Sequence, residues 1–212
     1  MNKKTILFDL DGTLTDSGEG IFSCTEEVLR HFNLPIPPRN EMRFMIGPPL
    51  TESYPKFGIL PENMDEALAI YRRHYQAGGI FQNFPYPGIP ELLQKLKQQG
   101  HILCVATSKP EHMARIILEH FELDQHFDLI CGASSDRTRS TKSDVIAYLL
   151  QQADKNNEMI MIGDTIYDVL GAKEFSIPTI GVAWGYGVEA DMLQAGAIAI
   201  AKDTGDLFLL LQ

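Results

Sequence analysis

From residue 89 onward, the sequence alternates between helical and strand patterns, and this alternation restricts the fold more than any other feature. Apolar runs rich in strand-forming residues lie at 102–106, 129–131, 159–162, 179–182 and 198–201. Helical spacing of apolar residues marks the segments 91–99, 113–120, 144–151 and 169–175. A further short apolar strand, 5–8, opens the chain. The pattern predicts an α/β fold, a Rossmann-like parallel sheet with helices on both faces.

The segment between the first strand and this alternating region has a different pattern. Residues 17–85 contain several stretches with helical spacing, interrupted by proline and glycine at 35–38 and 47–49, and no convincing strand. Pro61 opens another helical stretch, and Gly78-Gly79 ends it. We therefore expect a small all-helical domain, residues 17–85, inserted after the first strand of a core made of residues 1–16 and 86–212.

The first strand stops at an acidic loop, Asp9-Leu10-Asp11-Gly12-Thr13. In an open α/β sheet, ligands bind at the carboxyl ends of the strands, so Asp9 and Asp11 lie where a ligand is expected. Two carboxylates so close repel each other unless a cation or a shared proton lies between them. Mg²⁺ prefers carboxylate and carbonyl oxygens. A single acid here is commonly just part of a turn, but the complete motif predicts a magnesium site.

Polar residues also follow later strands. Thr107 follows the strand at 102–106 and can donate to a bound phosphate oxygen, although a helix N-cap is the alternative. Lys142 stands near the start of a predicted helix, where the helix dipole disfavours a cation, which hints at a functional role, and a solvated surface lysine is the alternative. Asp164 follows the strand at 159–162, and Asp168 lies one helical turn further on. Acids often only cap a helix, but together with Asp9 and Asp11 they favour a metal site.

The composition of the chain indicates which classes of partner it can bind and in which cellular compartment it works. The chain has 212 residues, 44% of them hydrophobic, and a net charge of −10 without any basic stripe. We therefore expect a globular protein that binds neither nucleic acid nor an anionic membrane. Cys24, Cys104 and Cys131 have no metal-binding or disulfide spacing, which favours buried thiols in a reducing cytoplasm. No apolar run has the length of a signal peptide or membrane span. Oligomeric state has no signature in the sequence.

The four polar motifs, taken in chain order, resemble the signatures of the haloacid-dehalogenase-like superfamily of aspartate-nucleophile phosphohydrolases. They are Asp9-Leu10-Asp11-Gly12-Thr13-Leu14, then Thr107, then Lys142, then Gly163-Asp164 with Asp168. The helical insertion is similar to the small cap of that family, so the resemblance spans essentially the whole chain. Within the family, the segment 181–187 resembles the stretch after the fifth strand in phosphoglycolate-phosphatase-like members. Its glycines lack the G-x-G-x-x-G spacing of dinucleotide sites.

The resemblance implies roles for the acidic residues. Asp9 is implied to be the nucleophile that forms an aspartyl-phosphate. Asp11 is implied to protonate the leaving alkoxide and later to activate the attacking water. Mg²⁺ is implied to be held by Asp9, the backbone carbonyl of Asp11 and Asp164, with Asp168 in support.

The resemblance also implies how a small phosphorylated metabolite is bound. Thr107, Ser108 and Lys142 are implied to hold the phosphoryl oxygens, where positioning and charge stabilisation provide most of the catalysis. The cap is implied to close over the site and to select the leaving group. Arg43 is a candidate for a substrate contact from the cap, and a solvated arginine is the alternative.

The implied activity is Mg²⁺-dependent hydrolysis of a small phosphomonoester such as phosphoglycolate. A 5′-nucleotidase or a pyrophosphatase of the same family is the main alternative. Haloacid dehalogenation is disfavoured because Asp11 is present, and a sugar-phosphate mutase because Gly47 is followed by Pro48-Pro49-Leu50 without the expected cap arginine. A non-enzymatic phosphoacceptor switch uses similar residues, but it is usually shorter and lacks both the cap and the second acid.

Overall fold

The computed structural model describes residues 3–136, 138–153 and 157–212, and the chain divides into two compact units. Unit 1 consists of Met1–Thr15 and Pro85–Gln212, and unit 2 of Asp16–Phe84. A two-stranded sheet, β2 (Thr15–Asp16) with β3 (Phe84–Pro85), lies where the chain passes from one unit to the other. Strands of two residues carry no periodicity, which explains why the sequence pattern does not indicate them.

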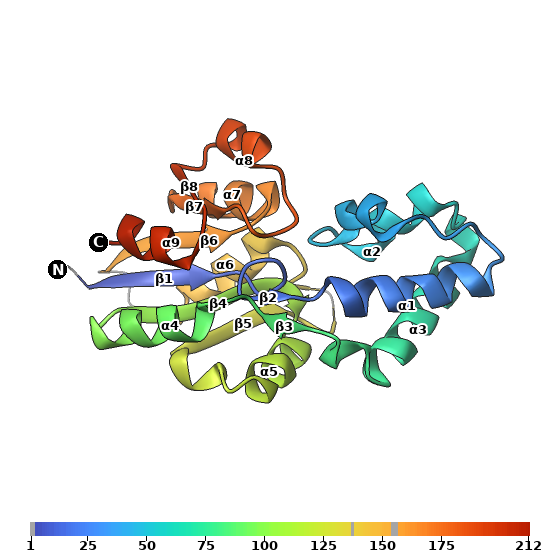
Figure 1. The fold of residues 1–212 in the computed structure, drawn as a ribbon, viewed down its shortest axis with the longest axis horizontal. Coiled ribbons are helices and arrows are strands. Elements are labelled where there is room, and N and C mark those ends of the chain that lie inside the picture. Colours follow the sequence, from blue (N-terminus) through green and yellow to red (C-terminus); the bar gives the residue numbers. More distant parts are fainter. Residues whose placement is uncertain (1–2, 137, 154–156) are drawn as a thin grey trace. The chain divides into compact units, whose positions relative to one another are not determined.

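Unit 1 is built on a six-stranded sheet in which all pairings are parallel (Figure 1). The strand order is β5-β4-β1-β6-β7-β8. The strands are β1 (Lys4–Phe8), β4 (Ile102–Pro110), β5 (Leu129–Ala133), β6 (Glu158–Gly163), β7 (Thr179–Val182) and β8 (Ala199–Ala201). The predicted parallel α/β sheet is therefore confirmed.

Helices cover both faces of this sheet. Helix α6 packs against α7, α7 against α8, and α4 against α9. Because crossovers between parallel strands are right-handed, α6, α7 and α8 lie on one face, and α4, α5 and α9 on the other. Their bounds are α4 (Ile89–Gln98), α5 (Glu111–His120), α6 (Lys142–Leu150), α7 (Ile166–Lys173), α8 (Glu189–Ala195) and α9 (Thr204–Leu210), with the 3₁₀ turn η6 (Asp124–His126).

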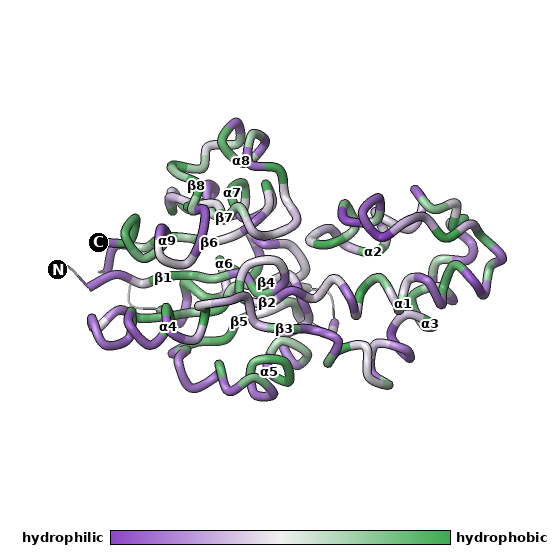
Figure 2. Tube along the Cα trace, in the orientation of Figure 1, coloured by the Kyte–Doolittle hydropathy of each residue, from purple (hydrophilic) through white to green (hydrophobic). Residues whose placement is uncertain are grey.

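The apolar sides of these elements form the core of unit 1. On α4, Leu92, Leu93 and Leu96 are buried, and the helix alternates between apolar and polar stretches (Figure 2). Burying side chains of this size stabilises the fold by about 1.5–3 kcal/mol each. One cluster between the sheet and α6 includes Leu7, Cys104 and Met161. All three cysteines of the chain are buried free thiols.

The register of the three central strands brings their carboxyl ends to one level. Phe8 of β1 lies opposite Val105 of β4 and Ile162 of β6. The backbone N–H of Asp9 then donates to the carbonyl of Ile162 over 2.9 Å. The next residue of each strand, Asp9, Ala106 and Gly163, therefore belongs to one row. This row marks the side of the sheet formed by the carboxyl ends of the strands, called the carboxyl edge below, where the sequence predicts the functional residues.

Unit 2 is helical between its ends. Its elements are α1 (Gly18–His31), η1 (Arg39–Glu41), η2 (Arg43–Met45), α2 (Leu50–Ser53), η3 (Tyr54–Phe57), η4 (Pro61–Asn63), α3 (Met64–Gln76) and η5 (Gly79–Phe81). Helix α1 packs against α3. The stretches 39–45 and 50–57, which lie beside the prolines noted in the sequence, are largely 3₁₀ turns, because these prolines leave too little chain for longer helices. No helix in the described ranges is long and apolar enough to cross a membrane.

Candidate active site

Three aspartates meet at the carboxyl edge of the sheet. Asp9 follows β1, Asp164 follows β6, and Asp168 lies in the first turn of α7. One carboxylate oxygen from each lies within 4.8 Å of the other two. Asp164 and Asp168 are fully buried and Asp9 is 7% exposed. The fold therefore brings together the side chains of three of the four residues predicted to hold a metal ion.

Lys142 lies among these carboxylates. It is the first residue of α6, and its ammonium lies 2.8 Å from Asp9 Oδ1 and 2.8 Å from Asp168 Oδ1. It also donates to the carbonyl of Ala106 over 2.8 Å. An ammonium has three donors, so these three contacts use all of them. Its unfavourable place at a helix N-terminus is thus offset by two ion pairs.

Burial and charge shift the pKa values of this cluster. Burial raises the pKa of Asp9, and the positive charge of Lys142 opposes part of that rise. Burial raises the pKa of Asp164 well above its usual range, and the negative charges of Asp168 and Asp9 add to the effect. Burial alone would lower the pKa of Lys142, but Asp168 and Asp9 together raise it. Asp9 and Asp164 therefore resist ionisation as long as no further positive charge is present.

The donor set fits a divalent cation. If all three aspartates are ionised, the single ammonium of Lys142 leaves two negative charges uncompensated in a buried site. Asp9 Oδ1 accepts from the N–H of Leu10 over 2.7 Å and pairs with Lys142, whereas Asp9 Oδ2 has no partner among the described residues. Carboxylate oxygens are the ligands that Mg²⁺ takes. The cluster therefore has the charge, the ligand type and a free oxygen for such an ion.

Asp164 is held in place by two loops. The hydroxyl of Thr13 donates to its Oδ1 over 3.3 Å, and the N–H of Tyr186 to its Oδ2 over 2.8 Å. A Cβ at Gly12 would lie 2.2 Å from Asp164 Oδ2, and one at Gly185 would lie 2.3 Å from Asp164 Cβ. Both positions therefore require glycine, and Gly12 also has φ of +86°. This contact gives the segment 181–187 a structural role that the sequence pattern left open.

Asp168 has two functions in the local structure. Its Oδ2 accepts from the N–H and from the hydroxyl of Thr165, each over 3.0 Å, and so caps the start of α7. Its Oδ1 pairs with Lys142. The helix cap considered in the sequence analysis and the place in the acidic cluster therefore coexist, because the two oxygens serve different partners.

Asp11 lies outside this cluster and has a partner that the sequence analysis missed. The ammonium of Lys109 lies 2.8 Å from Asp11 Oδ2 and 3.1 Å from Asp11 Oδ1. The side chains of Lys109 and Asp11 are 7% and 16% exposed. A basic residue two positions after Thr107 on the same strand shares its side of the chain. That spacing was the signal that could have identified Lys109.

The remaining predicted residues are placed as follows. Thr107 is buried, and its hydroxyl accepts from the N–H of Lys109 over 3.2 Å, so it does not cap α5, whose N-cap is Pro110. Ser108 follows it on β4. The strand was expected to end at Ala106, but β4 continues to Pro110, with its pairing to β5 interrupted in between.

Arg43 belongs to η2 of unit 2, and its predicted contact with a substrate stays a prediction.

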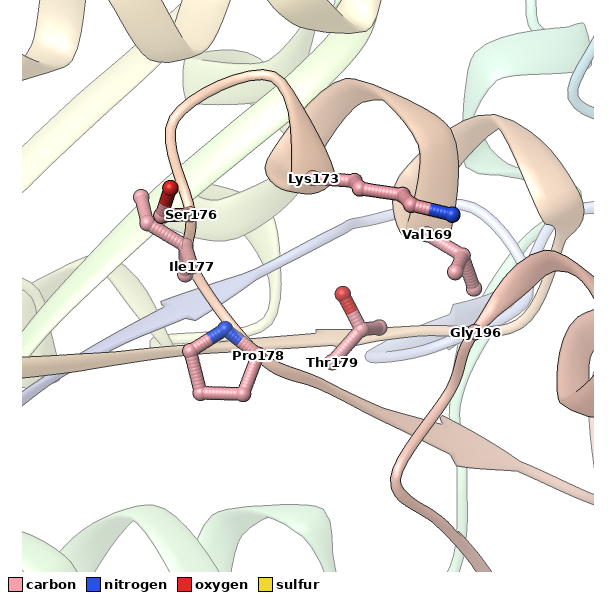
Figure 3. A pocket seen from close by; sticks show the side chains of 7 residues that line it. All are labelled: Val169, Lys173, Ser176, Ile177, Pro178, Thr179 and Gly196. Carbon is pink, nitrogen blue, oxygen red and sulfur yellow. The ribbon is translucent and has the colours of Figure 1, made fainter.

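A cavity of about 300 Å³ lies at the opposite edge of the sheet, where β7 begins (Figure 3). Lys173 reaches across it and donates to the carbonyl of Ala195 over 3.2 Å. The lining residues carry no carboxylate: they are Val169, Lys173, Ser176, Ile177, Pro178, Thr179 and Gly196. Because open α/β sheets bind ligands at their carboxyl ends, the acidic cluster and not this cavity is the candidate active site.

Comparisons with known proteins show which family the chain is similar to. A family model described as haloacid dehalogenase-like hydrolase matches residues 6–182. The chain is 44% identical to a tyrosine-protein kinase, PtkA, of Mycobacterium tuberculosis, covering 86% of this chain and 62% of that protein. It thus spans less than two thirds of that relative. It is 40% identical to a 5′-nucleotidase of Pseudomonas aeruginosa, covering 88% and 86%, and 30% identical to a phosphoglycolate phosphatase of Aquifex aeolicus, covering 86% of each.

Among solved structures, the fold is similar to the crystal structure of a predicted phosphatase from Clostridium acetobutylicum. The TM-score is 0.92 at 39% identity, and the match covers 100% of this chain and 99% of that one. These matches confirm the resemblance drawn from the sequence motifs and agree with the parallel sheet of unit 1.

Proposed function

The chain belongs to the haloacid dehalogenase-like hydrolase family, and from this premise we propose that it is a Mg²⁺-dependent phosphatase acting on a small phosphomonoester. The observation that carries the proposal is the buried cluster of Asp9, Asp164 and Asp168 around Lys142. Its composition suits phosphoryl transfer, in which a protein contributes mainly positioning and charge stabilisation.

Asp9, Asp164 and the backbone carbonyl of Asp11 would hold the metal ion, with Asp168 in support. This set supports the proposal because the three carboxylates exceed the ammonium of Lys142 in charge and are buried. Bound there, Mg²⁺ would supply positive charge to the phosphoryl oxygens.

Asp9 would act as the nucleophile through one of its carboxylate oxygens. A bond forms between that oxygen and phosphorus while the bond from phosphorus to the leaving oxygen breaks. Asp11 gives its proton to that leaving oxygen. A water molecule then attacks the aspartyl-phosphate, its proton passes to Asp11, and inorganic phosphate leaves Asp9 in its starting state.

Three further residues would stabilise the transferring group. Lys142 is fixed beside Asp9 and can neutralise a phosphoryl oxygen from that position. Thr107 and Ser108, near the end of the neighbouring strand β4, would donate to the same group. Donors that are already oriented in a buried site stabilise developing charge at little cost in reorganisation.

Phosphoglycolate is our first candidate substrate, and a nucleoside 5′-monophosphate the second. The first rests on the sequence resemblance and on the relative from Aquifex aeolicus. The second is favoured by the higher identity to a protein named 5′-nucleotidase. Pyrophosphate is a third candidate within the same chemistry.

The test is release of inorganic phosphate from phosphoglycolate, nucleoside 5′-monophosphates, pyrophosphate and p-nitrophenyl phosphate, with Mg²⁺ or with EDTA. ATP with a tyrosine peptide is included because one relative is named a tyrosine kinase. We expect Mg²⁺-dependent release that is absent from Asp9→Asn and retained in Asp191→Asn, a change at an exposed acid of α8. A stable phosphoprotein without release, or release unaffected by EDTA, would contradict the proposal.

A further inference from the structure

Trp184 connects two loops of the candidate active site. Its indole Nε1 donates to the carbonyl of Thr13 over 3.1 Å. Thr13 belongs to the loop after β1, whereas Trp184 belongs to the loop after β7. The proposed reaction gives no role to this tryptophan, which is the only one in the chain. Its hydrogen bond points to a role at Asp164, and that role rests on the proposed function, in which Asp164 holds the metal ion.

The contact closes a ring of hydrogen bonds and backbone around Asp164. The hydroxyl of Thr13 donates to Asp164 Oδ1 over 3.3 Å, and the N–H of Tyr186 donates to Asp164 Oδ2 over 2.8 Å. Trp184 binds Thr13 on one side and is joined to Tyr186 by a short piece of backbone on the other. Both oxygens of the carboxylate are therefore oriented by groups that Trp184 links together.

The two loops that the indole joins are anchored separately at their bases. In the loop after β1, the N–H of Leu14 donates to the carbonyl of Leu10 over 2.9 Å. In the loop after β7, the N–H of Ala183 donates over 2.9 Å to the carbonyl of Ala201, at the end of β8. The hydrogen bond of Trp184 thus joins two loops that different strands support.

Two of the proposed metal ligands are attached to these loops. Asp164 is bound by both of them, and the backbone carbonyl of Asp11 lies in the loop after β1, shortly before Thr13. A ligand that is already oriented loses less freedom when the ion binds. For this reason, removing a group that holds a metal ligand in place typically lowers the affinity for the metal by about 10–100-fold.

We propose that Trp184 is a positioning residue of the metal site. By tying the two loops together, its N–H keeps the carboxylate of Asp164 oriented before Mg²⁺ binds, and so raises the affinity for the ion. The alternative is packing alone, because the indole also lies beside the ring of Tyr86, with the ring centroids 6.4 Å apart. Positioning affects the binding of Mg²⁺, whereas packing affects stability at every Mg²⁺ concentration.

The experiment measures the dissociation constant of Mg²⁺ from the rise of Tm with Mg²⁺ concentration, a readout that needs no turnover. Trp184→Phe removes the N–H and keeps an aromatic ring. We expect it to raise the dissociation constant by about tenfold or more. Phosphate release by this variant should be low at limiting Mg²⁺ and should return to the wild-type kcat at saturating Mg²⁺, with little change in the KM for the ester.

A double-mutant cycle tests the path through Thr13. Thr13→Val removes the hydroxyl that binds Asp164, keeps a similar shape and should also weaken Mg²⁺ binding. If Trp184 acts through Thr13, the double variant should bind Mg²⁺ more tightly than the product of the two single effects predicts, because both changes open the same ring. Effects that simply multiply would contradict the proposed path.

The matched control is Phe121→Leu, which also removes aromatic bulk. Phe121 follows α5, a helix of 10 residues, and so lies about 15 Å from the start of that helix. We expect it to keep the wild-type dissociation constant. Melts without Mg²⁺ show whether each variant folds, and if Trp184→Phe does not, Trp184→Leu replaces it.

The outcomes separate this inference from the proposed function. An unchanged dissociation constant in Trp184→Phe would overturn the inference, and so would a loss of kcat that saturating Mg²⁺ does not restore. In both cases the phosphatase proposal would stand, because the wild-type protein would still release phosphate with Mg²⁺. A wild-type protein that neither gains Tm with Mg²⁺ nor releases phosphate from any ester would instead refute the proposed function.

Discussion

Lys142 and Lys109 both meet aspartates at the carboxyl edge of the same sheet, but they are held in different ways. Lys142 is fully committed to two carboxylates and a strand carbonyl, and it joins β1, β4 and α7. Lys109 meets Asp11, which lies on a loop, from an irregular part of β4. Lys142 therefore lies within a cluster that several regular elements hold together, whereas the pair of Lys109 and Asp11 lies outside that cluster. The first position suits charge stabilisation of the transferring phosphoryl group, and the second suits holding Asp11 in place.

The largest expected effect is on catalysis by the cluster of Asp9, Asp164 and Asp168 around Lys142, called the fixed cluster below. Asp9→Asn should lower kcat by about 10³-fold or more, because the proposed nucleophile is lost. Single-turnover phosphate release measures the effect, and Asp191→Asn is the matched acid-to-amide control. A loss of less than tenfold would mean that Asp9 is not the nucleophile.

The two lysines should also differ in their contribution to stability. Lys142→Met removes the counter-charge of three buried carboxylates and should lower the free energy of unfolding by about 3–5 kcal/mol at neutral pH. Lys109→Met breaks a pair closer to solvent and should cost about 1–2 kcal/mol. Urea denaturation without added metal measures both.

A second substitution sharpens this difference. Adding Asp168→Asn to Lys142→Met should recover part of the lost stability, since one uncompensated charge disappears. Equal losses for the two lysine variants would contradict the contrast between Lys142 within the buried cluster and Lys109 outside it.

Addition of Mg²⁺ should act on the fixed cluster alone. At 100 times its dissociation constant the ion stabilises the folded state by about 2.7 kcal/mol, which raises the Tm of a chain of this size by roughly 5–10 °C. We expect this shift in the wild type and in Lys109→Met, and its loss in Asp164→Asn. A shift in Asp164→Asn equal to that of the wild type would place the ion elsewhere.

The smallest expected effect is the contribution of His101, at the amino-terminal ends of the strands, to the free energy of unfolding. Its pH dependence decides the pH at which the lysine variants are compared. Burial and the nearby charge of Lys4 lower the pKa of His101, whose Nδ1 accepts from the N–H of Lys4 over 3.1 Å. The unfolded chain therefore takes up a proton that the folded ring refuses. Stability from this residue is complete above the usual histidine pKa near 6.5 and falls as the pH drops below it.

The corresponding variant isolates this contribution. His101→Gln keeps an acceptor for the N–H of Lys4 and should make the unfolding free energy at pH 5.5 and 7.5 more alike, by at most about 1.4 kcal/mol. Urea denaturation at the two pH values provides the measurement. An unchanged pH dependence would show that His101 has no part in it, and the lysine variants are best compared at pH 7.5.

Much of the fixed cluster could be predicted from the sequence, because it depends on backbone register. The apolar runs of β1, β4 and β6 are easily recognised, and parallel pairing then brings Asp9 and Asp164 to one edge whatever their side-chain rotamers. Lys142 was indicated by its poor fit to a helix N-terminus. The sequence motifs were thus sufficient to predict those site residues whose positions are set by the backbone of the sheet.

The pairing of Lys109 with Asp11 could not be predicted in the same way. It depends on the rotamer of a long side chain and on the irregular end of β4, which runs past the expected boundary at Ala106. Periodicity carries no information about either. The 3₁₀ turns of unit 2 were also hidden, because a period of 3.0 residues cannot be told from one of 3.6 residues over a single turn.

The position of β1 in the chain has a consequence for folding during synthesis. β1 is made before both of its partners, β4 (Ile102–Pro110) and β6 (Glu158–Gly163), which follow much later in the chain. Until then this apolar strand has no neighbour in the sheet. Pairing over such sequence separations is slow because loop closure precedes any gain from contacts. The strand that carries Asp9 is therefore made before the other strands of its sheet and is among the last to be paired.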